Sequence, residues 1–343
     1  MGKLFIISAL SLFAVQNVVA QDPVFSQFYT SSLYLNPALA GLEKDIVLGM
    51  NYRSQWAGVN LPFRTFQFSA IHPIVQQGVK SKHLGGFGAS LFSDEAGPNR
   101  EVVSQGFSVA SSYNFHLDRS GNHLIATALQ FGVLQRQINM DALQWSSQYS
   151  AVLGYDPSQP GENLISERLT NPVIHAGMVW RLVIGKRFKA TKTFYQGLAV
   201  ANINRPRGFF PNEKDAPSVL YKAHGGYLHH FSNGLELSPN YLIQYQHNLQ
   251  VNIGAYAAYA MPAVTAKSVA DLKVSLGMWY RIDDSFIITS GLATNSWSAG
   301  FSYDANNSSL ERNFQGANAF EISFAYRISI MKTVIKKFST PLI

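Results

Sequence analysis

A period of two in the hydrophobicity pattern constrains this chain more than any other feature. Residues 320–328 read Phe-Glu-Ile-Ser-Phe-Ala-Tyr-Arg-Ile, so one parity is apolar while the other carries Glu321, Ser323 and Arg327. Residues 272–280 alternate in a similar way. Because successive side chains of a β-strand point to opposite faces of its sheet, this pattern predicts strands with one apolar and one polar face.

The predicted strands are long. An average globular strand has about five or six residues, whereas a tilted strand needs roughly 9–11 residues to cross a bilayer. Most of the alternating segments reach the longer figure, and their polar faces are rich in Ser, Gly, Asn and Gln. The fourteen predicted strands cover 45–54, 63–72, 84–92, 103–115, 123–136, 172–183, 195–203, 219–230, 235–246, 250–260, 271–281, 285–293, 296–304 and 318–329.

Aromatic residues lie near the ends of these segments, as expected where strands cross a membrane–water boundary. They are Tyr52, Trp56, Phe63, Trp180, Tyr195, Tyr241 and Trp297. Lipid offers no hydrogen-bond partner to an open sheet edge, so spanning strands must close into a barrel. We therefore predict an all-β fold, a transmembrane outer-membrane β-barrel of about 14 antiparallel strands. A soluble β-sandwich or propeller is the alternative, and the strand length argues against it.

The composition excludes several chemistries. The 343 residues contain no Cys, which excludes disulfide scaffolds, thiol catalysis and thiolate metal sites. Charged residues make up only 14%, and a formal charge of +7 spread over this length does not indicate nucleic-acid binding. His224, His229 and His230 share one predicted strand and are interpreted as polar lining rather than as a zinc site. We expect no cofactor, no metal and no enzymatic activity, although an outer-membrane hydrolase stays a further hypothesis because a catalytic triad is geometric rather than sequential.

The two ends of the chain differ from the alternating region. Residues 1–20 read as a signal peptide, with Lys3 before an apolar stretch that is too short to span a bilayer. Residues 21–44 contain Pro23 and Pro37 and an apolar surface, and are predicted to form a plug in the lower mouth of the barrel. A partner-binding or flexible lead-in segment is the alternative. The barrel is expected at 45–329, followed by a basic C-terminal tail at 330–343.

An even strand number places both ends of the barrel on the periplasmic side, so the long connections 137–171, 204–218 and 305–317 fall on the outer side. Outer connections carry most acidic residues, among them Asp304, whereas the inner turns and the tail are basic. A basic inner rim is predicted to dock an acidic periplasmic partner, and contact with water or lipid phosphates is the alternative. The candidate partner-binding residues are Lys186, Arg187, Lys189, Lys192, Lys332, Lys336 and Lys337.

Several sequence blocks resemble one known family. Residues 21–29 read Gln-Asp-Pro-Val-Phe-Ser-Gln-Phe-Tyr, and residues 33–41 read Leu-Tyr-Leu-Asn-Pro-Ala-Leu-Ala-Gly. With Tyr-Arg-Ser-Gln-Trp at 52–56 and the blocks at 276–281 and 324–327, they resemble the PorP/SprF family of type IX secretion system membrane proteins. The tail beyond the final strand departs from the many barrels that stop at a strand-terminal aromatic.

The resemblance implies an outer-membrane component of the type IX secretion system in Bacteroidetes-type bacteria. Such a protein aids export or surface attachment of a secreted adhesin-like protein and, in some members, gliding motility. The partners expected are a secreted cargo protein at the outer loops, periplasmic secretion-system components at the inner face, and outer-membrane lipid, with no nucleic acid. An outer-membrane diffusion channel of the fatty-acid-transporter type is the alternative function, because fourteen strands suit it as well.

Overall fold

The protein is described by a computed structural model that covers most of the chain after residue 22. The described residues are 23–56, 58, 62–76, 82–150, 154–156, 158–159, 168–185, 191–207, 218–261, 272–307 and 317–330. Residues 1–22 and 331–343 lie outside this set, so the structure does not describe the predicted signal peptide or most of the tail.

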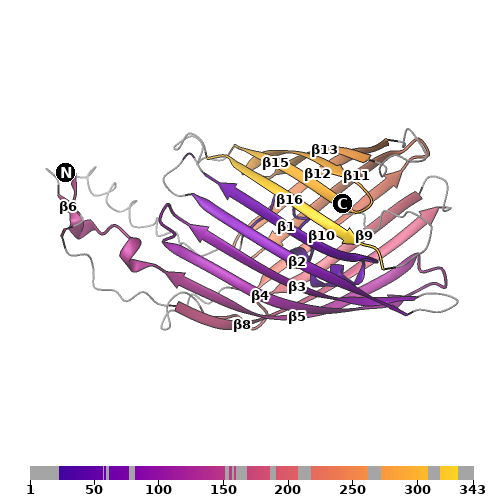
Figure 1. Ribbon diagram of the computed structural model, residues 1–343, viewed down its shortest axis with the longest axis horizontal. Helices are drawn as coiled ribbons and strands as arrows, with labels where there is room; N and C mark the ends of the chain where they lie inside the picture. The colour runs from indigo at the N-terminus through magenta and orange to yellow at the C-terminus, as the bar shows by residue number, and fades with distance from the viewer. Residues whose placement is uncertain are drawn as a thin grey trace, which may run out of the picture.

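Fourteen antiparallel strands form one closed barrel (Figure 1). Neighbours in sequence are neighbours in the wall, and the first strand pairs with the last, with Ile46 opposite Ile328 and Gln55 opposite Ala319. The strands are β1 (Ile46–Gln55), β2 (Phe63–Gln76), β3 (Lys82–Ala96), β4 (Val102–His116), β5 (His123–Ile138), β8 (Arg168–Gly185), β9 (Thr191–Ala201), β10 (Leu220–His230), β11 (Leu235–Tyr245), β12 (Leu249–Met261), β13 (Leu272–Arg281), β14 (Ser285–Ala293), β15 (Trp297–Asn306) and β16 (Ala319–Ile328).

All fourteen predicted strands are present, and the closed barrel is confirmed. The largest difference in length is in the wall from β2 to β8, where β3 ends at Ala96 and β8 begins at Arg168. At those ends both faces of the strand are polar, so the hydrophobic alternation that predicts a strand is lost while the ladder of hydrogen bonds continues.

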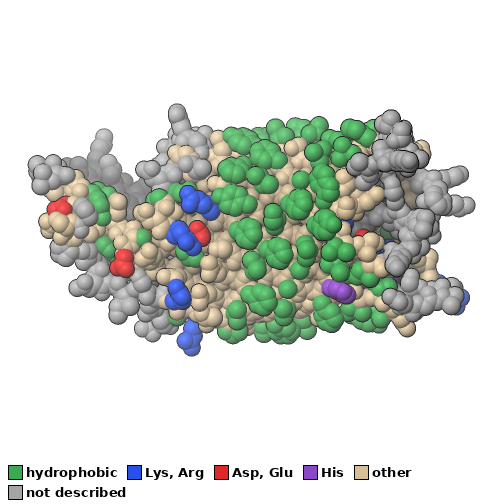
Figure 2. Space-filling model, viewed as in Figure 1, with side chains coloured by type: hydrophobic (Ala, Val, Ile, Leu, Met, Phe, Trp, Pro, Cys, Tyr) green, Lys and Arg blue, Asp and Glu red, His purple; other side chains and the backbone are tan. Residues whose placement is uncertain are grey.

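The outward face of the barrel is apolar (Figure 2). Met278 is 74% exposed and Ile288 is 60% exposed, and many other large apolar side chains share this surface. An apolar surface that encircles the molecule is stable only against lipid, which is the outward band of a membrane barrel. No helix within the described ranges is long and apolar enough to cross a membrane.

One predicted member of the aromatic girdle is wrong. Tyr195 is 1% exposed and points into the barrel, because it shares a parity on β9 with the inward-facing Thr193 rather than with the outward-facing Phe194. Tyr52, by contrast, is 38% exposed on the outer face, as expected for a girdle residue.

Residues 23–44, here called the lumen segment, lie inside the barrel. The segment contains the short helix α2 (Ser32–Leu35) and the 3₁₀ turn η2 (Pro37–Gly41). Leu33, Ala38 and Leu39 are at most 2% exposed. The main apolar core of the molecule therefore lies in the lumen, between this segment and the inward faces of the strands.

The long connection after β5 extends beyond the barrel wall at one end of the molecule (Figure 1). It contains the 3₁₀ turns η3 (Met140–Ala142) and η4 (Ser146–Gln148) and the short strands β6 (Tyr149–Ser150) and β7 (Gly154–Tyr155). Barrels carry their longer connections on the cell-surface side. We therefore refer to this end as the outer end and to the opposite end, where β1 begins, as the inner end.

Candidate functional site in the barrel lumen

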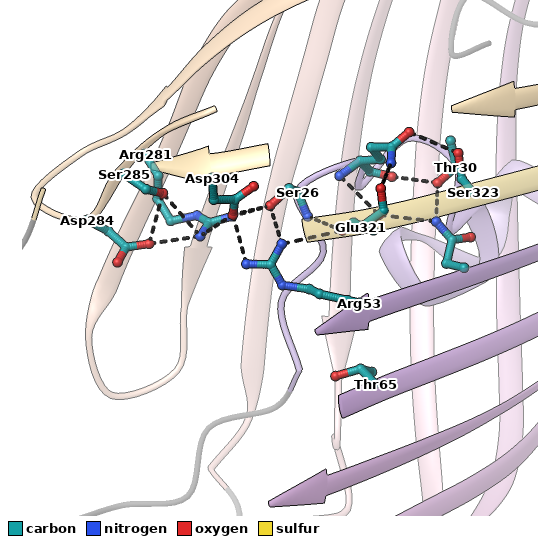
Figure 3. Close-up of polar contacts among 12 residues, drawn as sticks. Ser26, Thr30, Arg53, Thr65, Arg281, Asp284, Ser285, Asp304, Glu321 and Ser323 are labelled. Atoms are coloured by element: carbon teal, nitrogen blue, oxygen red, sulfur yellow. Dashed lines mark hydrogen bonds and ion pairs between the residues drawn. The ribbon is translucent and has the colours of Figure 1, made fainter. Parts of the chain in front are cut away.

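Ser26 of the lumen segment is bound by charged side chains at the outer end of the lumen (Figure 3). Its hydroxyl donates to Asp304 Oδ2 at 2.5 Å and accepts from Arg53 at 2.5 Å and from Arg281 at 2.9 Å. Its backbone N–H donates to Glu321 Oε2 at 2.7 Å. One donor and two acceptor positions are the full capacity of a serine hydroxyl, so this residue is completely satisfied.

The residues around Ser26 form an outer ion cluster of Arg53, Arg281, Asp284, Asp304 and Glu321. Arg53 lies 2.8 Å from Asp304 and 3.6 Å from Glu321, and all three side chains are at most 4% exposed. Arg281 lies 2.8 Å from Asp284 and 3.4 Å from Asp304. The cluster joins β1, β13, β15 and β16 to each other and to the lumen segment.

Asp304 was predicted on an outer connection, and that placement is wrong. It lies within β15 and its side chain points into the lumen, where it is 3% exposed. The predicted strand 296–304 ends at this residue, whereas β15 continues to Asn306 and the Asp304 side chain pairs with Arg53, which only the closed barrel brings near.

The residues beside Ser26 extend the contact along the final strand. Gln27 donates from its backbone to Glu321 Oε1 at 3.2 Å, and its amide nitrogen donates to the Glu321 carbonyl at 3.1 Å. Ser323 donates to the Gln27 side-chain oxygen at 2.9 Å. Asn51 of β1 donates to both Thr30 and Glu321. The segment is thus hydrogen-bonded to β1 and β16, the two strands whose pairing closes the barrel.

The middle of the lumen segment is held by Asn36. Its amide nitrogen donates to the carbonyls of Met178 and Leu198, each at 3.1 Å, and lies 3.1 Å from His224 Nε2. Gly177 makes this approach possible, because a Cβ atom there would lie 2.0 Å from Asn36 Oδ1.

The segment reaches the inner end at Gly41. Its carbonyl accepts from the Asn114 amide at 2.6 Å, near the inner end of β4. A Cβ atom on Gly86 would lie 2.2 Å from the Ala40 carbonyl, so the wall and the segment touch through backbone here. The segment therefore runs from the outer end at Ser26 to the inner end at Gly41, and is not confined to the lower mouth as expected.

Apolar contacts fill the space between these polar anchors. Phe28 meets Trp279 edge to face at 5.2 Å between ring centroids, and Tyr29 stacks on Trp279 at 5.9 Å. Leu242, which breaks the alternation of β11, is 2% exposed and belongs to the same cluster. Leu242, an apolar residue on the polar face of β11, is therefore the feature of the sequence that indicates a segment in the lumen.

The polar groups of this site bind the lumen segment. Its buried charges face each other, and its hydroxyl and amide groups are used in anchoring the segment. No group of three or more His, Asp or Glu side chains among the described residues could hold a metal ion. The three His of β10 are separated: His224 faces Asn36, His229 bonds Tyr227 at 2.8 Å, and His230 lies 3.0 Å from Glu236.

The predicted partner-binding residues are mostly beyond what the structure describes. Lys192 lies near the start of β9, at the inner end, and is exposed. Lys186, Arg187, Lys189, Lys332, Lys336 and Lys337 lie outside the described residues. None of the seven belongs to the outer ion cluster, which sequence reasoning did not assemble because only closure of the barrel brings Arg53 of β1 to the other four members.

A cavity of about 60 Å³ lies between the lumen segment and the wall from β3 to β10. Its apolar lining includes Leu33, Leu35, Leu134 and Leu220, and Lys222 reaches it from β10.

We expect substitution of Arg53 by Ala to lower the free energy of unfolding by about 3–5 kcal/mol, since Asp304 and Glu321 would stay buried without their partner. Urea titration of the purified barrel in detergent, followed by tryptophan fluorescence, measures this change. Arg100→Ala is the matched control, because Arg100 pairs with Glu95 but is 56% exposed; its loss should cost only about 0–1 kcal/mol. Equal costs for the two variants would contradict an anchoring role for the cluster.

Solved structures of other barrels show limited likeness to this chain. A Pseudomonas aeruginosa FadL homologue is 13% identical with a TM-score of 0.46, covering 88% of this chain and 94% of its own. The translocator domain of the autotransporter NalP from Neisseria meningitidis is 12% identical with a TM-score of 0.36, covering 89% of this chain and 100% of its own. These scores are too low to indicate a shared function.

The family comparison is more informative. A search of curated proteins found no significant match. A family model described as type IX secretion system membrane protein PorP/SprF matches residues 17–326, which include the lumen segment and nearly the whole barrel. The blocks that first indicated this family include Ser26, Asn36, Arg53 and Arg281, the residues that join the segment to the wall. The chain therefore belongs to the PorP/SprF family of type IX secretion system membrane proteins, and its barrel lies in the outer membrane.

Proposed function

We propose that this outer-membrane barrel aids export or surface attachment of a secreted adhesin-like protein and, through it, gliding motility in a Bacteroidetes-type bacterium. It does so by binding and positioning its partners, without catalysis. The family match over residues 17–326 carries this proposal. The structure adds two supporting features, a filled lumen and a long outer connection.

A filled lumen favours a binding role over a conducting one. The lumen segment is anchored at the outer end by Ser26, in the middle by Asn36 and at the inner end by Gly41. These three anchors leave it little freedom to swing aside. In this proposal the segment acts as the plug of the barrel and closes it to solutes.

The outer connection offers a surface for the cargo protein. Tyr149 and Tyr155 face each other across the β6–β7 pair with ring centroids 5.3 Å apart, and are 55% and 37% exposed. Exposed aromatic side chains are the commonest anchors of protein interfaces. The β6–β7 pair lies beyond the barrel wall at the outer end (Figure 1), which supports this connection as the surface that meets the cargo.

The second candidate function is a diffusion channel of the fatty-acid-transporter type. The cavity beside Leu33 and Leu134 favours it, since its lining is mostly apolar. This channel would require the lumen segment to move, because the segment forms part of the cavity wall.

Conductance separates the two functions. We expect the whole protein to show no steady conductance in a planar lipid bilayer, and a chain lacking residues 23–42 to open a persistent pore. Gly177→Leu is a second variant, since its side chain would push Asn36 from the wall and should produce intermittent opening. Conductance of the whole protein equal to that of the truncated chain would overturn the closed lumen.

Surface display tests the cargo role. We expect a strain that lacks this protein to lose one or a few exported proteins from its surface. Expression of the unchanged chain should restore them. The double variant Tyr149→Ala/Tyr155→Ala should restore at least about tenfold less of the displayed proteins than the unchanged chain does. A tenfold loss corresponds to about 1.4 kcal/mol of binding free energy at an interface. Asp141→Ala, an exposed change in the same connection, is the matched control. Quantitative proteomics after protease shaving of intact cells gives the readout, and normal display in the deletion strain would contradict the proposal.

The inner rim is proposed to dock acidic periplasmic components of the secretion system through Lys192 and the six other basic residues named above. A chain in which Lys192 is replaced by Glu should retain less of its periplasmic partners during purification at low salt, because exposed charge attraction is weakened by charge reversal. Recovery of the same partners in the same amounts, at low and at high salt, would show that the rim charges have no part in docking.

A further inference from the structure

A row that contains two Arg, one Glu and one Gln crosses five neighbouring strands near the outer end. Strand register places Arg64 of β2 opposite Glu95, Glu95 opposite Val103, Val103 opposite Gln137, and Gln137 opposite Arg168 of β8. Directly opposite residues of antiparallel strands share a face of the sheet, so these five form one continuous row.

This row faces away from the lumen. Arg64 and Arg168 are exposed, whereas their sequence neighbours Thr65 and Asn171, on the other parity, are buried in the barrel interior. The row is therefore directed sideways, toward whatever surrounds the barrel.

The height of the row relative to the apolar band follows from the register. Two residues nearer the barrel centre on each strand lies a second row, which is mostly uncharged and polar: Phe66, Ser93, Gln105, Gln135 and Thr170. Two residues further in lies a third row, which is apolar: Phe68, Leu91, Phe107, Val133 and Pro172. Four residues of strand span roughly 13 Å, or about 10 Å along the membrane normal at the usual tilt. On each strand the outer member of the row thus lies about 10 Å beyond an apolar residue of the lipid-facing band, as expected for contact with lipid headgroups.

The net charge of this row is positive. Glu95 is bound by Arg100 at 2.7 Å, and the Arg168 guanidinium is oriented by two hydrogen bonds to Gln137 Oε1 at 3.1 and 2.9 Å. The row itself holds two Arg and one Glu, a net charge of +1, and Arg100 from the turn between β3 and β4 adds a third Arg beside it. Lys and Arg side chains follow the outer edge of the apolar band on this face (Figure 2). At the outer ends of β11, β14 and β15 the exposed side chains are instead Tyr245, Phe286 and Tyr303.

We propose that this row binds the phosphate headgroups of lipids in the outer leaflet. A guanidinium presents paired N–H donors that match two phosphate oxygens, and Arg168 already has a fixed orientation. Arg64 and Arg168 are four strand spacings apart, roughly 19 Å, so each takes its own phosphate. The barrel would then be held with its β2–β8 side against phosphorylated lipid and its aromatic side against uncharged lipid.

Native mass spectrometry of the full chain released from detergent tests this proposal, with dioleoyl phosphatidic acid as the added lipid. We expect Arg64→Gln/Arg168→Gln to weaken binding of phosphatidic acid at least about tenfold, and each single change to remove part of it. Arg119→Gln removes one exposed positive charge at an inner turn and should leave binding unchanged. Unaltered heat-dependent gel mobility shows that each variant is folded.

Two further additions distinguish the source of the phosphate. Phosphatidylcholine should bind more weakly than phosphatidic acid and should be insensitive to the two Arg changes. Inorganic phosphate at the same concentration should not compete, because it lacks the apolar chains that rest on the adjoining band. Equal binding by the double variant and the unchanged chain, or full competition by inorganic phosphate, would overturn the proposal, as would co-purification of a protein on this face that excludes the lipid.

Discussion

The need to pair every backbone N–H and C=O within lipid determines this structure. Strands can meet that need in a bilayer only when the last one returns to the first. Here the return is made by the pairing of β1 with β16 along their whole lengths. The two-faced strands follow, since closure turns one parity toward lipid and the other toward a lumen that must then be filled or hydrated.

The filling of that lumen combines two kinds of contact. Phe28, Leu35 and Leu39 pack in the apolar core that the segment shares with the inward faces of the strands. The outer ion cluster fixes the position of the segment's outer end. Buried charges cost several kcal/mol to desolvate, so they are tolerated only in one mutual arrangement. The contacts among Arg53, Asp304 and Ser26 therefore fix the outer end of the segment, and its apolar residues determine how tightly it packs against the wall.

The alternation of residues predicted the strands, their number and the closed barrel, because each of these is encoded locally. What could not be predicted depends on contacts between distant residues. Tyr195 was assigned to the membrane boundary because its position near a strand end says nothing about which parity faces lipid. Asp304 was assigned to an outer connection because its partner Arg53 lies 251 residues away. Leu242 breaks the alternation of β11 because the lumen segment packs against it, a contact that the local pattern does not specify.

The lumen segment also crosses the last seam of the barrel from inside. Arg53 and Asn51 come from β1 and Glu321 and Ser323 from β16, and all four bond to residues 26–30. The sheet has two open edges until those strands meet, so these four contacts to residues 26–30 come together only in the closed barrel. Binding the outer part of the lumen segment and sealing the wall therefore stabilise each other.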